Sequence, residues 1–355
     1  MPTPAVRLVR IDALRALMER ILAAAGCRPD VAATVADVFL QADLMGTSTQ
    51  GLHHLANLMV PTLRSGKIRP NAQPRLVKEG PAFALLDGGL GPGQLAGIAA
   101  ADLAAAKAKQ AGACAVGVVN SNDVYLVGYY GERIARAGCV GFVFSDAAPR
   151  VHPYGGTARV LGTNPLAIAL PTADAHPFVL DLATSAWSGG LIQVAAEFGD
   201  PLPAGIAVDP EGRPTTDAAE AWAGALAPFG GPKGFGLSLA VALLSGALVG
   251  AESGKALAGW RGASAGRVGK KGHLFLALEP NALGDATRFR NAASAYLKKI
   301  RRSRQALESG GIRVAGERAF QERARNLRAG TVPVLETTLA FAARLSKELG
   351  IPGLE

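Results

Sequence analysis

Cysteine is scarce in this chain of 355 residues, and its scarcity excludes two kinds of stabilisation. The three cysteines, Cys27, Cys114 and Cys139, are odd in number and far apart in the sequence. They cannot build a disulfide framework, and they do not have the spacing of a zinc site. No histidine pairs with a carboxylate at metal-ligand spacing either, so the sequence predicts no metal. Buried thiols in a reducing compartment, the cytoplasm, are expected.

Aromatic and charged residues are also few, at 6% and 18% of the chain, whereas hydrophobic residues make up 49%. These proportions exclude a disordered chain and predict a large aliphatic core. Residues 1–20 alternate apolar and charged positions and lack the apolar block of a signal peptide. The longest apolar stretch, residues 235–251, contains glycines and serines, so we expect a buried helix there and not a membrane span.

The net charge is +9, and the basic residues gather late in the chain, as in residues 298–304. Charge of this sign suits nucleic acid, but no nucleic-acid-binding module and no interleaved aromatic residues accompany it. We therefore expect no nucleic-acid partner and no membrane partner. A positive field that attracts an anionic cofactor or a small-molecule substrate is the better interpretation.

Hydrophobic periodicity predicts an α/β protein. Helical spacing covers residues 11–25, 29–44, 52–63, 94–110 and 129–137, and short apolar strands cover 83–87, 115–119, 140–145, 166–170, 178–182 and 274–278. The alternation of strands and helices indicates α/β units with partly parallel pairing. Three sections follow: a helical one at 1–75, an α/β lobe at 76–280, and a charged helical one at 281–355 that packs back on the first helices.

One glycine-rich segment imitates a nucleotide-binding loop. Gly89, Gly91 and Gly93 lie between a predicted strand and a predicted helix. The third glycine is not at the required spacing, and no acidic residue ends a second strand about 20 residues further on. We interpret the segment as a structural turn.

The most informative stretch is Leu-Gly-Thr-Asn-Pro at residues 161–165, followed by Asp-Leu-Ala-Thr-Ser at 181–185. It places turn formers and small hydrogen-bonding side chains at the ends of two buried strands. Backbone N–H groups and hydroxyls converging at such a turn suit phosphate or carboxylate. An ordinary turn between two core strands is the alternative.

These two motifs, with Pro-Lys-Gly-Phe-Gly at residues 232–236 and Gly-Glu at 316–317, resemble the malate/L-lactate dehydrogenase family of the second type. That family includes ureidoglycolate and sulfolactate dehydrogenases and cyclic-imine reductases. The resemblance implies a non-Rossmann α/β fold with a mixed-sheet NAD(P)-binding lobe and helical N- and C-terminal segments. It also implies a homodimer with the active site near the subunit interface, and NADPH or NADH as the cofactor.

The resemblance assigns cofactor contacts by motif. Physically, Lys233 can pair with a phosphate, and Gly234 lets the backbone approach a ligand, although a surface lysine is the alternative. The residues expected to bind the cofactor are Thr163, Asn164, Asp181, Leu182, Ala183, Thr184, Ser185, Trp187, Lys233, Gly234, Gly316, Glu317 and Arg318.

The catalytic region departs from the family pattern at three positions. Gln50 stands where the family carries its proton-donating histidine, His54 where it carries an arginine, and Asp123 where it carries a second histidine. We expect Thr49, Gln50, His54 and Asp123 to be catalytic. We expect the substrate to be bound by His53, His54, Asn120, Asp123 and His152.

These departures bear on the reaction. A glutamine cannot titrate, so a ketone reduced here needs another acid, His53 or His54. An iminium substrate already carries its proton, and a carboxylate such as Asp123 would stabilise that cation. The sequence thus favours an NAD(P)H-dependent reductase of an imine or keto acid next to a carboxylate. The alternatives are a malate- or lactate-type 2-hydroxy acid dehydrogenase, and a non-catalytic relative. His53, His54 and Asp123 could also be ordinary capping or turn residues.

Overall fold

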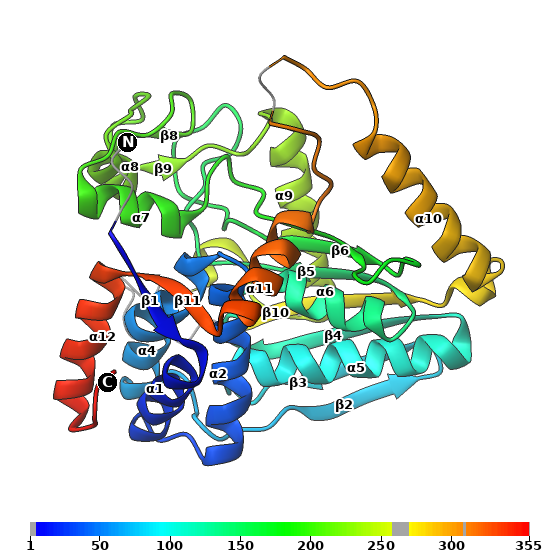
Figure 1. Cartoon of the computed structure of the whole chain (residues 1–355), viewed down its shortest axis with the longest axis horizontal. Coiled ribbons are helices and arrows are strands. Elements are labelled where there is room, and N and C mark those ends of the chain that lie inside the picture. The colour runs from blue at the N-terminus through cyan, green and yellow to red at the C-terminus, as the bar shows by residue number, and fades with distance from the viewer. Residues whose placement is uncertain (1–4, 258–269, 308–309, 355) are drawn as a thin grey trace.

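A mixed seven-stranded sheet forms the centre of the part of the chain that the computed structural model describes, residues 5–257, 270–307 and 310–354 (Figure 1). Its strand order is β2–β3–β4–β10–β5–β6–β7; β3 and β4 run parallel, and the other neighbouring pairs are antiparallel. The strands are β2 (Arg75–Gly80), β3 (Phe83–Asp87), β4 (Ala113–Ser121), β5 (Val140–Ser145), β6 (Leu166–Leu170), β7 (Phe178–Leu182) and β10 (Lys271–Leu278). The predicted α/β class with a mixed sheet is confirmed.

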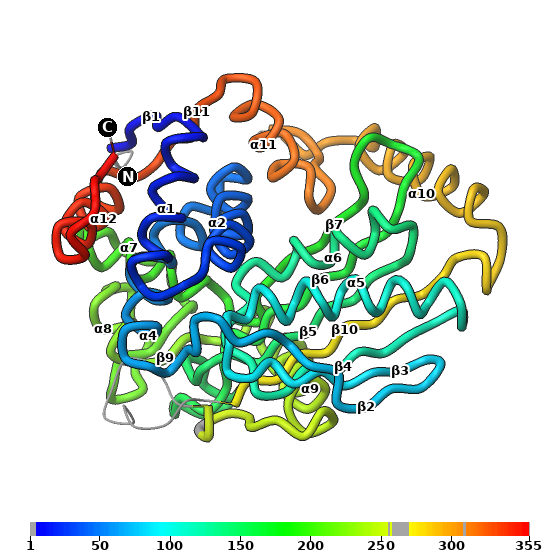
Figure 2. Tube along the Cα trace, turned by 90° about the horizontal axis from the view of Figure 1, so that it is seen from below, coloured from blue at the N-terminus to red at the C-terminus, as the bar shows by residue number. Residues whose placement is uncertain are grey.

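Helices cover both faces of this sheet. Helices α5 (Gly93–Ala111) and α6 (Val127–Arg136) lie on one face, and α9 (Pro232–Ser245) packs against β5 and β10 on the other (Figure 2). The buried face of α5 is made of alanines, which let the helix approach the sheet closely. Tyr130 and Phe275 fill the space between α6 and the sheet with edge-to-face rings 6.0 Å apart.

The late strand β10 lies between β4 and β5 and is antiparallel to both. The strand–helix–strand order had predicted partly parallel pairing, and β4 and β5 do point the same way, but β10 separates them. Strand β10 also begins at Lys271, three residues earlier than the predicted strand at 274–278. This extension brings Lys271 beside Ser121 at the end of β4.

The N-terminal helices form a second core at one end of the sheet. Helices α1 (Ile11–Ala24) and α2 (Pro29–Leu44) match the prediction, whereas the helix expected at 52–63 is divided. It consists of α3 (Leu52–His54), a π-helical turn η2 (Leu55–Met59) and α4 (Val60–Arg64), after the 3-10 turn η1 (Ser48–Gln50). Their apolar side chains share one cluster with residues from the end of the chain, including Val332 and Leu345.

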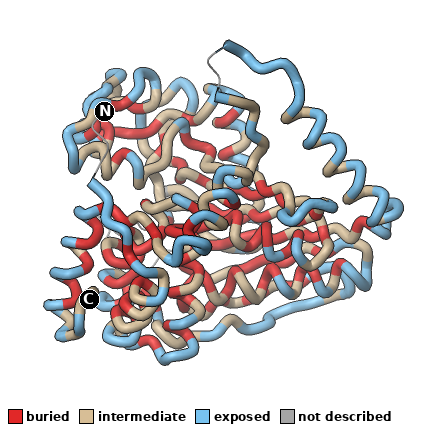
Figure 3. The backbone as a smooth tube through the Cα atoms, viewed as in Figure 1, coloured by how far each residue is buried: buried red, intermediate tan, exposed pale blue. Residues whose placement is uncertain are grey.

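The C-terminal segment returns to the N-terminal helices. Strand β11 (Thr331–Leu335) pairs with β1 (Val6–Arg10), and α12 (Glu336–Leu349) contacts α1 and α3. Helix α11 (Glu317–Ala329) contacts α2 and is tied to α6, because Arg323 donates to both oxygens of the Glu132 carboxylate at 2.7 and 3.0 Å. By contrast, α10 (Ala286–Arg301) has no buried residue and extends away from the body of the molecule (Figures 1 and 3).

A small unit between β7 and α9 was not predicted as separate elements. It packs around a cluster that includes Val151, Ile192 and Leu226. Its elements are α7 (Gly189–Phe198), β8 (Ala207–Val208), α8 (Ala218–Ala223) and β9 (Ala225–Leu226); the remaining short turns of the chain are η3 (Ala247–Val249), η4 (Gly254–Ala256) and η5 (Pro280–Ala282).

Helix α9 is buried on one face only, so the prediction of a buried helix there is wrong in part. The segment Pro232–Val249 is long and apolar enough to span a membrane by length and composition, and a third of it is buried. Its small residues Ser238, Ala242 and Ser245 face the sheet, whereas Leu239 and Leu243 are exposed. An apolar sequence therefore does not by itself specify which faces of a helix are covered.

A buried carboxyl group holds the turn that precedes α3. Asp43 on α2 is 2% exposed, and its Oδ2 accepts a hydrogen bond from the Leu52 backbone at 2.8 Å. Burial raises the pKa of Asp43 to about 7. Gly51 lies directly against this group, since a Cβ there would come within 2.0 Å of Asp43 Oδ1. The Thr49–Gln50–Gly51 turn is thus fixed by contact between a glycine and a buried carboxyl group.

We expect Gly51→Ala to lower the free energy of unfolding by about 1–3 kcal/mol, the usual cost of inserting a methyl group into filled space. Urea denaturation of both proteins measures the difference. Gly236→Ala is the matched control, because a Cβ at that helical position meets nothing within 4 Å; it should be neutral or stabilising by up to ~1 kcal/mol. Equal stability of Gly51→Ala and the wild type would contradict this account of the turn.

Candidate active site

Two adjoining cavities lie where the N-terminal helices meet the sheet. The inner cavity has a volume of about 200 Å³ and lies between η1, the loop after β4 and the loop after β5. The outer cavity, of about 500 Å³, lies between β7 and the start of α11. Both are lined by Gln50, Asp181, Ala183 and Ser188, so they adjoin at these residues. Together they have the size of a cofactor and substrate site.

The inner cavity brings together all four residues expected to be catalytic. Thr49, Gln50 and His54 come from the N-terminal helices, and Asp123 comes from the loop after β4. These segments are more than 60 residues apart in the sequence, and the sheet places them on one cavity. The predicted site residues that line the inner cavity are Thr49, Gln50, His54, Asp123, Thr163, Asp181 and Ala183.

A buried acceptor at the junction of the cavities fits a bound ligand. The side-chain oxygen Oε1 of Gln50 is buried and has no hydrogen-bond partner within the described residues. A buried acceptor left without a donor costs stability, so a donor from a ligand would satisfy it. The carboxamide of a nicotinamide ring and the hydroxyl of a substrate are both such donors.

The outer cavity has the groups that a dinucleotide needs. Of the predicted cofactor residues, Asp181, Leu182, Ala183, Gly316 and Arg318 line it. An arginine at this wall can pair with a phosphate, and the N-terminus of α11 adds backbone N–H groups. Gly316 caps α11 with φ of 88°, a conformation that favours glycine. The residues present therefore fit NADPH or NADH.

Asp181 is the acidic group common to both cavities. Its Oδ2 accepts a hydrogen bond from the Gly128 backbone at 2.8 Å, which ties the end of β7 to the start of α6. The side chain is open to the cavities but surrounded by protein, and this burial raises its pKa to about 6. At neutral pH the group is a carboxylate able to accept hydrogen bonds from ribose hydroxyls.

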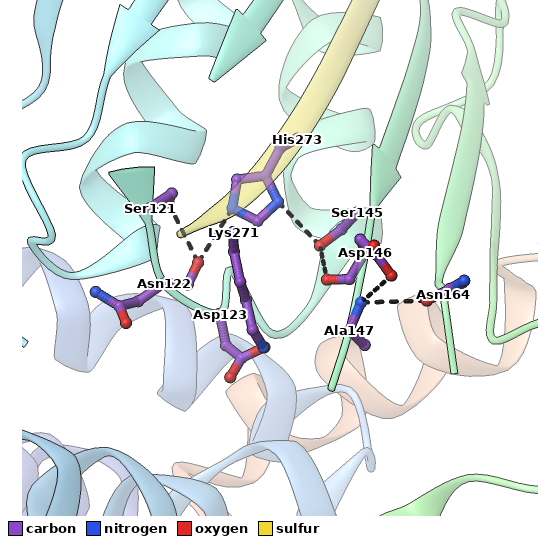
Figure 4. A network of polar contacts seen from close by, with 9 residues as sticks. All are labelled: Ser121, Asn122, Asp123, Ser145, Asp146, Ala147, Asn164, Lys271 and His273. Carbon is purple, nitrogen blue, oxygen red and sulfur yellow. Dashed lines mark hydrogen bonds and ion pairs between the residues drawn. The ribbon is translucent and has the colours of Figure 1, made fainter. Parts of the chain in front are cut away.

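Lys271 is the main functional candidate that the sequence analysis missed. It lines the inner cavity at the start of β10, is 7% exposed, and forms an ion pair with Asp123 (Figure 4). An irregularity in the β4–β10 register lies between Lys271 and His273, and bulges of this kind redirect side chains. Burial raises the pKa of Asp123, but the adjacent Lys271 ammonium outweighs it and holds the pKa below its usual range.

This ion pair corrects the electrostatic part of the sequence interpretation. Asp123 was expected to be an uncompensated negative charge that turns the site towards cations. Lys271 neutralises it, and Arg150, also missed, lines the same cavity with its guanidinium 3.8 Å from the centre of the Trp222 ring. The inner cavity thus contains cationic donors suited to a carboxylate.

His273 is a structural neighbour of this pair. It is fully buried, with Nδ1 2.9 Å from Ser145 Oγ and Nε2 3.1 Å from the Asn122 carbonyl oxygen (Figure 4). Burial lowers its pKa to about 4, so the ring is neutral at physiological pH. The neutral ring donates from Nε2 to Asn122 and accepts from Ser145. It thereby fixes the loop that carries Asp123.

Other predicted site residues lie outside both cavities because they hold the surrounding loops. The Asn164 side chain, fully buried, accepts from the Ala147 backbone at 3.1 Å and donates to Ser238 Oγ at 3.1 Å. Thr184 Oγ1 donates to the carbonyl oxygen of Thr163 at 3.1 Å. The predicted residues outside the two cavities are His53, Asn120, His152, Asn164, Thr184, Ser185, Trp187, Lys233, Gly234 and Glu317.

The Pro-Lys-Gly-Phe-Gly motif is one of these displaced segments. Lys233 is exposed in the first turn of α9. Gly234 is required by the chain itself, since a Cβ would come within 1.8 Å of the Phe229 carbonyl oxygen. In this structure the close approach that the glycine permits is therefore to another part of the backbone, and not to a ligand.

Three further displaced residues have local partners. His53 points towards the C-terminal segment, with Nδ1 3.4 Å from Thr338 Oγ1. His152 Nδ1 lies 2.9 Å from the carbonyl oxygen of Pro153. Glu317 begins α11 and accepts from the Val314 backbone at 2.9 Å, beside a third cavity of about 470 Å³.

A sequence signal for Lys271 did exist. In residues 271–278, Lys271 and His273 alternate with apolar positions on the same face of a strand as Phe275. A lysine on the buried face of a strand needs a partner, and this is a reason to regard it as functional. Predicting the strand from Leu274 onward left Lys271 outside it.

Comparison with known proteins agrees with the geometry. The family profile of malate/L-lactate dehydrogenases matches residues 9–341. The chain is 36% identical to the L-sulfolactate dehydrogenase of Methanocaldococcus jannaschii, over 92% of each chain. It is 33% identical to a Delta(1)-pyrroline-2-carboxylate/Delta(1)-piperideine-2-carboxylate reductase of Pseudomonas putida, over 90% of this chain and 92% of that one. The solved malate dehydrogenase of Pyrococcus horikoshii superposes with a TM-score of 0.89 at 32% identity, covering 100% of this chain and 99% of that one.

The relatives and the site give one conclusion about class. The similar proteins are dehydrogenases and reductases of acids, and the expected cofactor and enzyme class are confirmed. The protein is an NAD(P)-dependent oxidoreductase that acts on acid substrates. Its fold, its motifs at residues 161–185 and its matched length show that it belongs to the malate/L-lactate dehydrogenase family.

Proposed function

We propose that this protein interconverts a 2-hydroxy acid and the corresponding 2-keto acid. The observation that carries the proposal is the pairing of Lys271 with Asp123 in the inner cavity. The pair provides a cationic hydrogen-bond donor without a net negative charge, so a carbonyl oxygen is accommodated better than an iminium ion. Arg150 on the same cavity is the group to pair with the substrate carboxylate.

In this proposal the residues of the outer cavity would hold the cofactor, which when bound would supply hydride to the substrate carbon or accept it from there. Asp181 accepts hydrogen bonds from a ribose, and Arg318 pairs with a phosphate. Gln50, at the junction, orients the carboxamide or the substrate through its buried Oε1. The protein residues thus bind and orient both reactants.

Reduction of a cyclic imine carboxylate is the second candidate. A glutamine in place of an acid at position 50 suits an imine, which brings its own proton, and two relatives are named as pyrroline-2-carboxylate reductases. The sequence favoured this reaction because Asp123 was considered alone. Its partner Lys271 removes that reason and places the keto acid first. The two cavities and the retained residues for cofactor binding also argue against a non-catalytic protein.

The substrate classes separate by steady-state assay. We expect kcat/KM for the best of oxaloacetate, pyruvate and sulfopyruvate to exceed that for Delta(1)-pyrroline-2-carboxylate by at least ~10-fold, which corresponds to about one charge-assisted hydrogen bond. NADPH and NADH oxidation at 340 nm measures both. A higher kcat/KM for the imine would identify the imine, and not the keto acid, as the preferred substrate.

Cofactor binding should depend on the ionisation of Asp181. Because its pKa is about 6, lowering the pH through 6 neutralises the carboxylate and weakens its hydrogen bonds to a ribose. We expect the Kd of NADPH or NADH to rise below pH 6, and Asp181→Asn to weaken binding by about 10-fold and abolish that pH dependence. Fluorescence titration measures Kd. Asp174→Asn, an exposed aspartate outside the two cavities, is the control and should behave as the wild type.

We also propose that the protein is a cytoplasmic homodimer in which a second copy covers the exposed face of α9. Leu239 and Leu243 are 39% and 61% exposed on a helix that is otherwise apolar. Light scattering after gel filtration should give a dimer for the wild type and a monomer for Leu243→Glu. Leu327→Glu, an exposed leucine on α11, is the control and should remain dimeric. A monomeric wild type would contradict the proposal.

A further inference from the structure

We propose that Lys271 is the residue that transfers the proton in this active site, with Asp123 as the residue that positions it. This inference rests on the proposed function, since it assigns the group that a 2-keto acid requires at its oxygen. It replaces the expectation that His53 or His54 takes over from the glutamine at position 50.

The geometry favours Lys271. Its side chain is 9% exposed and lines the inner cavity at the start of β10. Its ammonium group forms an ion pair with the Asp123 carboxylate. An ammonium group has three N–H donors, and the ion pair uses one. Lys271 pairs with Ser121 of β4, and from His273 onward β10 is held between β4 and β5, so the lysine extends from the end of a rigid strand, as proton transfer to a bound substrate requires.

The other titratable groups around Lys271 are less suited to the transfer. His273 is neutral and has both ring nitrogens engaged. Burial, followed by the charge of Asp123, raises the pKa of Tyr125 well above its usual value, so its hydroxyl is a poor proton donor. Burial also raises the pKa of Asp146, whose Oδ1 accepts from Ala147. Asp181 on the same cavity has a pKa of about 6 and is a carboxylate at neutral pH. His54 also lies on this cavity, with its ring centre 5.6 Å from that of Tyr125, and it is a competitor that experiment must test.

The proton balance is simple. Reduction leaves an electron pair on the carbonyl oxygen, and an O–H bond forms there as an Nζ–H bond of Lys271 breaks. The lysine becomes a neutral amine beside the Asp123 carboxylate and regains a proton from water. In the oxidation direction the amine takes the hydroxyl proton. The ion pair with Asp123 holds the reprotonated lysine in place for the next turnover.

Three lysine variants test the proposal in the full-length protein. Lys271→Met should lower kcat for keto-acid reduction by at least about 100-fold, the usual contribution of a general acid. Lys271→Arg should lose a similar factor, because a guanidinium keeps the ion pair with Asp123 but does not give up its proton. Lys270→Met is the matched control: this neighbouring lysine is exposed, and its variant should stay within ~2-fold of the wild type.

Two further measurements separate proton transfer from a structural role. Methylamine should restore activity to Lys271→Ala in proportion to its concentration. Oxamate, a keto-acid analogue that cannot be reduced, should bind the wild type about 10-fold more tightly than it binds Lys271→Met, because the ammonium donates to its carbonyl oxygen. In Lys271→Met the Kd of NADPH or NADH should change by less than about 3-fold, since the lysine lies outside the outer cavity.

The outcomes distinguish the inference from the function. If the wild type reduces a keto acid and Lys271→Arg does so equally well, Lys271 is not the proton donor and the inference is overturned. The inference is also overturned if His54→Gln loses activity by about 100-fold or more, the factor expected for losing a general acid, while Lys271→Met keeps the activity of the wild type. If the wild type reduces no 2-keto acid, the proposed function fails and the role of Lys271 fails with it.

Discussion

The pairing of β10 between β4 and β5 is the constraint on which the site depends. This strand comes late in the sequence and is antiparallel to both neighbours. Its first five residues, 271–275, are buried. It completes the centre of the sheet and places Lys271 and His273 opposite the ends of strands that precede them by more than 100 residues. Hydrogen bonds on both edges leave little freedom in this placement. The loop at 121–123 and the end of β5 are therefore held against one rigid strand.

Within that frame, the charge of the inner cavity depends on a pair and not on a single residue. Asp123 without Lys271 would be a partly buried anion that favours cationic ligands. With Lys271 beside it, the pair is neutral overall but presents donors to the cavity. Removing either partner leaves a charge with no compensation in a poorly solvated place, which costs more than the pair itself contributes. The chemistry of the site thus follows from the relation between two residues that are 148 positions apart.

The two cavities are lined by three different parts of the fold. The N-terminal helices supply Gln50 and His54, the sheet supplies Asp181, and the returning C-terminal segment supplies Gly316 and Arg318. Ion pairs of Glu132 with Arg323 connect α6 and α11 across this boundary. Motif residues such as Asn164 and Gly234 act one layer further out, because they hold the loops and helix that form the walls. A motif can therefore be necessary to a site without touching its ligand.

The sequence by itself determined the α/β class and many helix and strand positions, because hydrophobic periodicity and turn residues are local. The family and the cofactor followed from the resemblance of its motifs to those of a known family. The sequence also singled out Gln50, His54, Asp123 and Asp181, which the structure brings to one pair of cavities. It could not determine that β10 lies between β4 and β5, that β1 pairs with β11, or that Lys271 neutralises Asp123. Those relations join residues far apart in the chain, and strand order and ion pairing are settled by packing in three dimensions. The tertiary structure alone therefore decided the electrostatic character of the site, and with it which substrate class we place first.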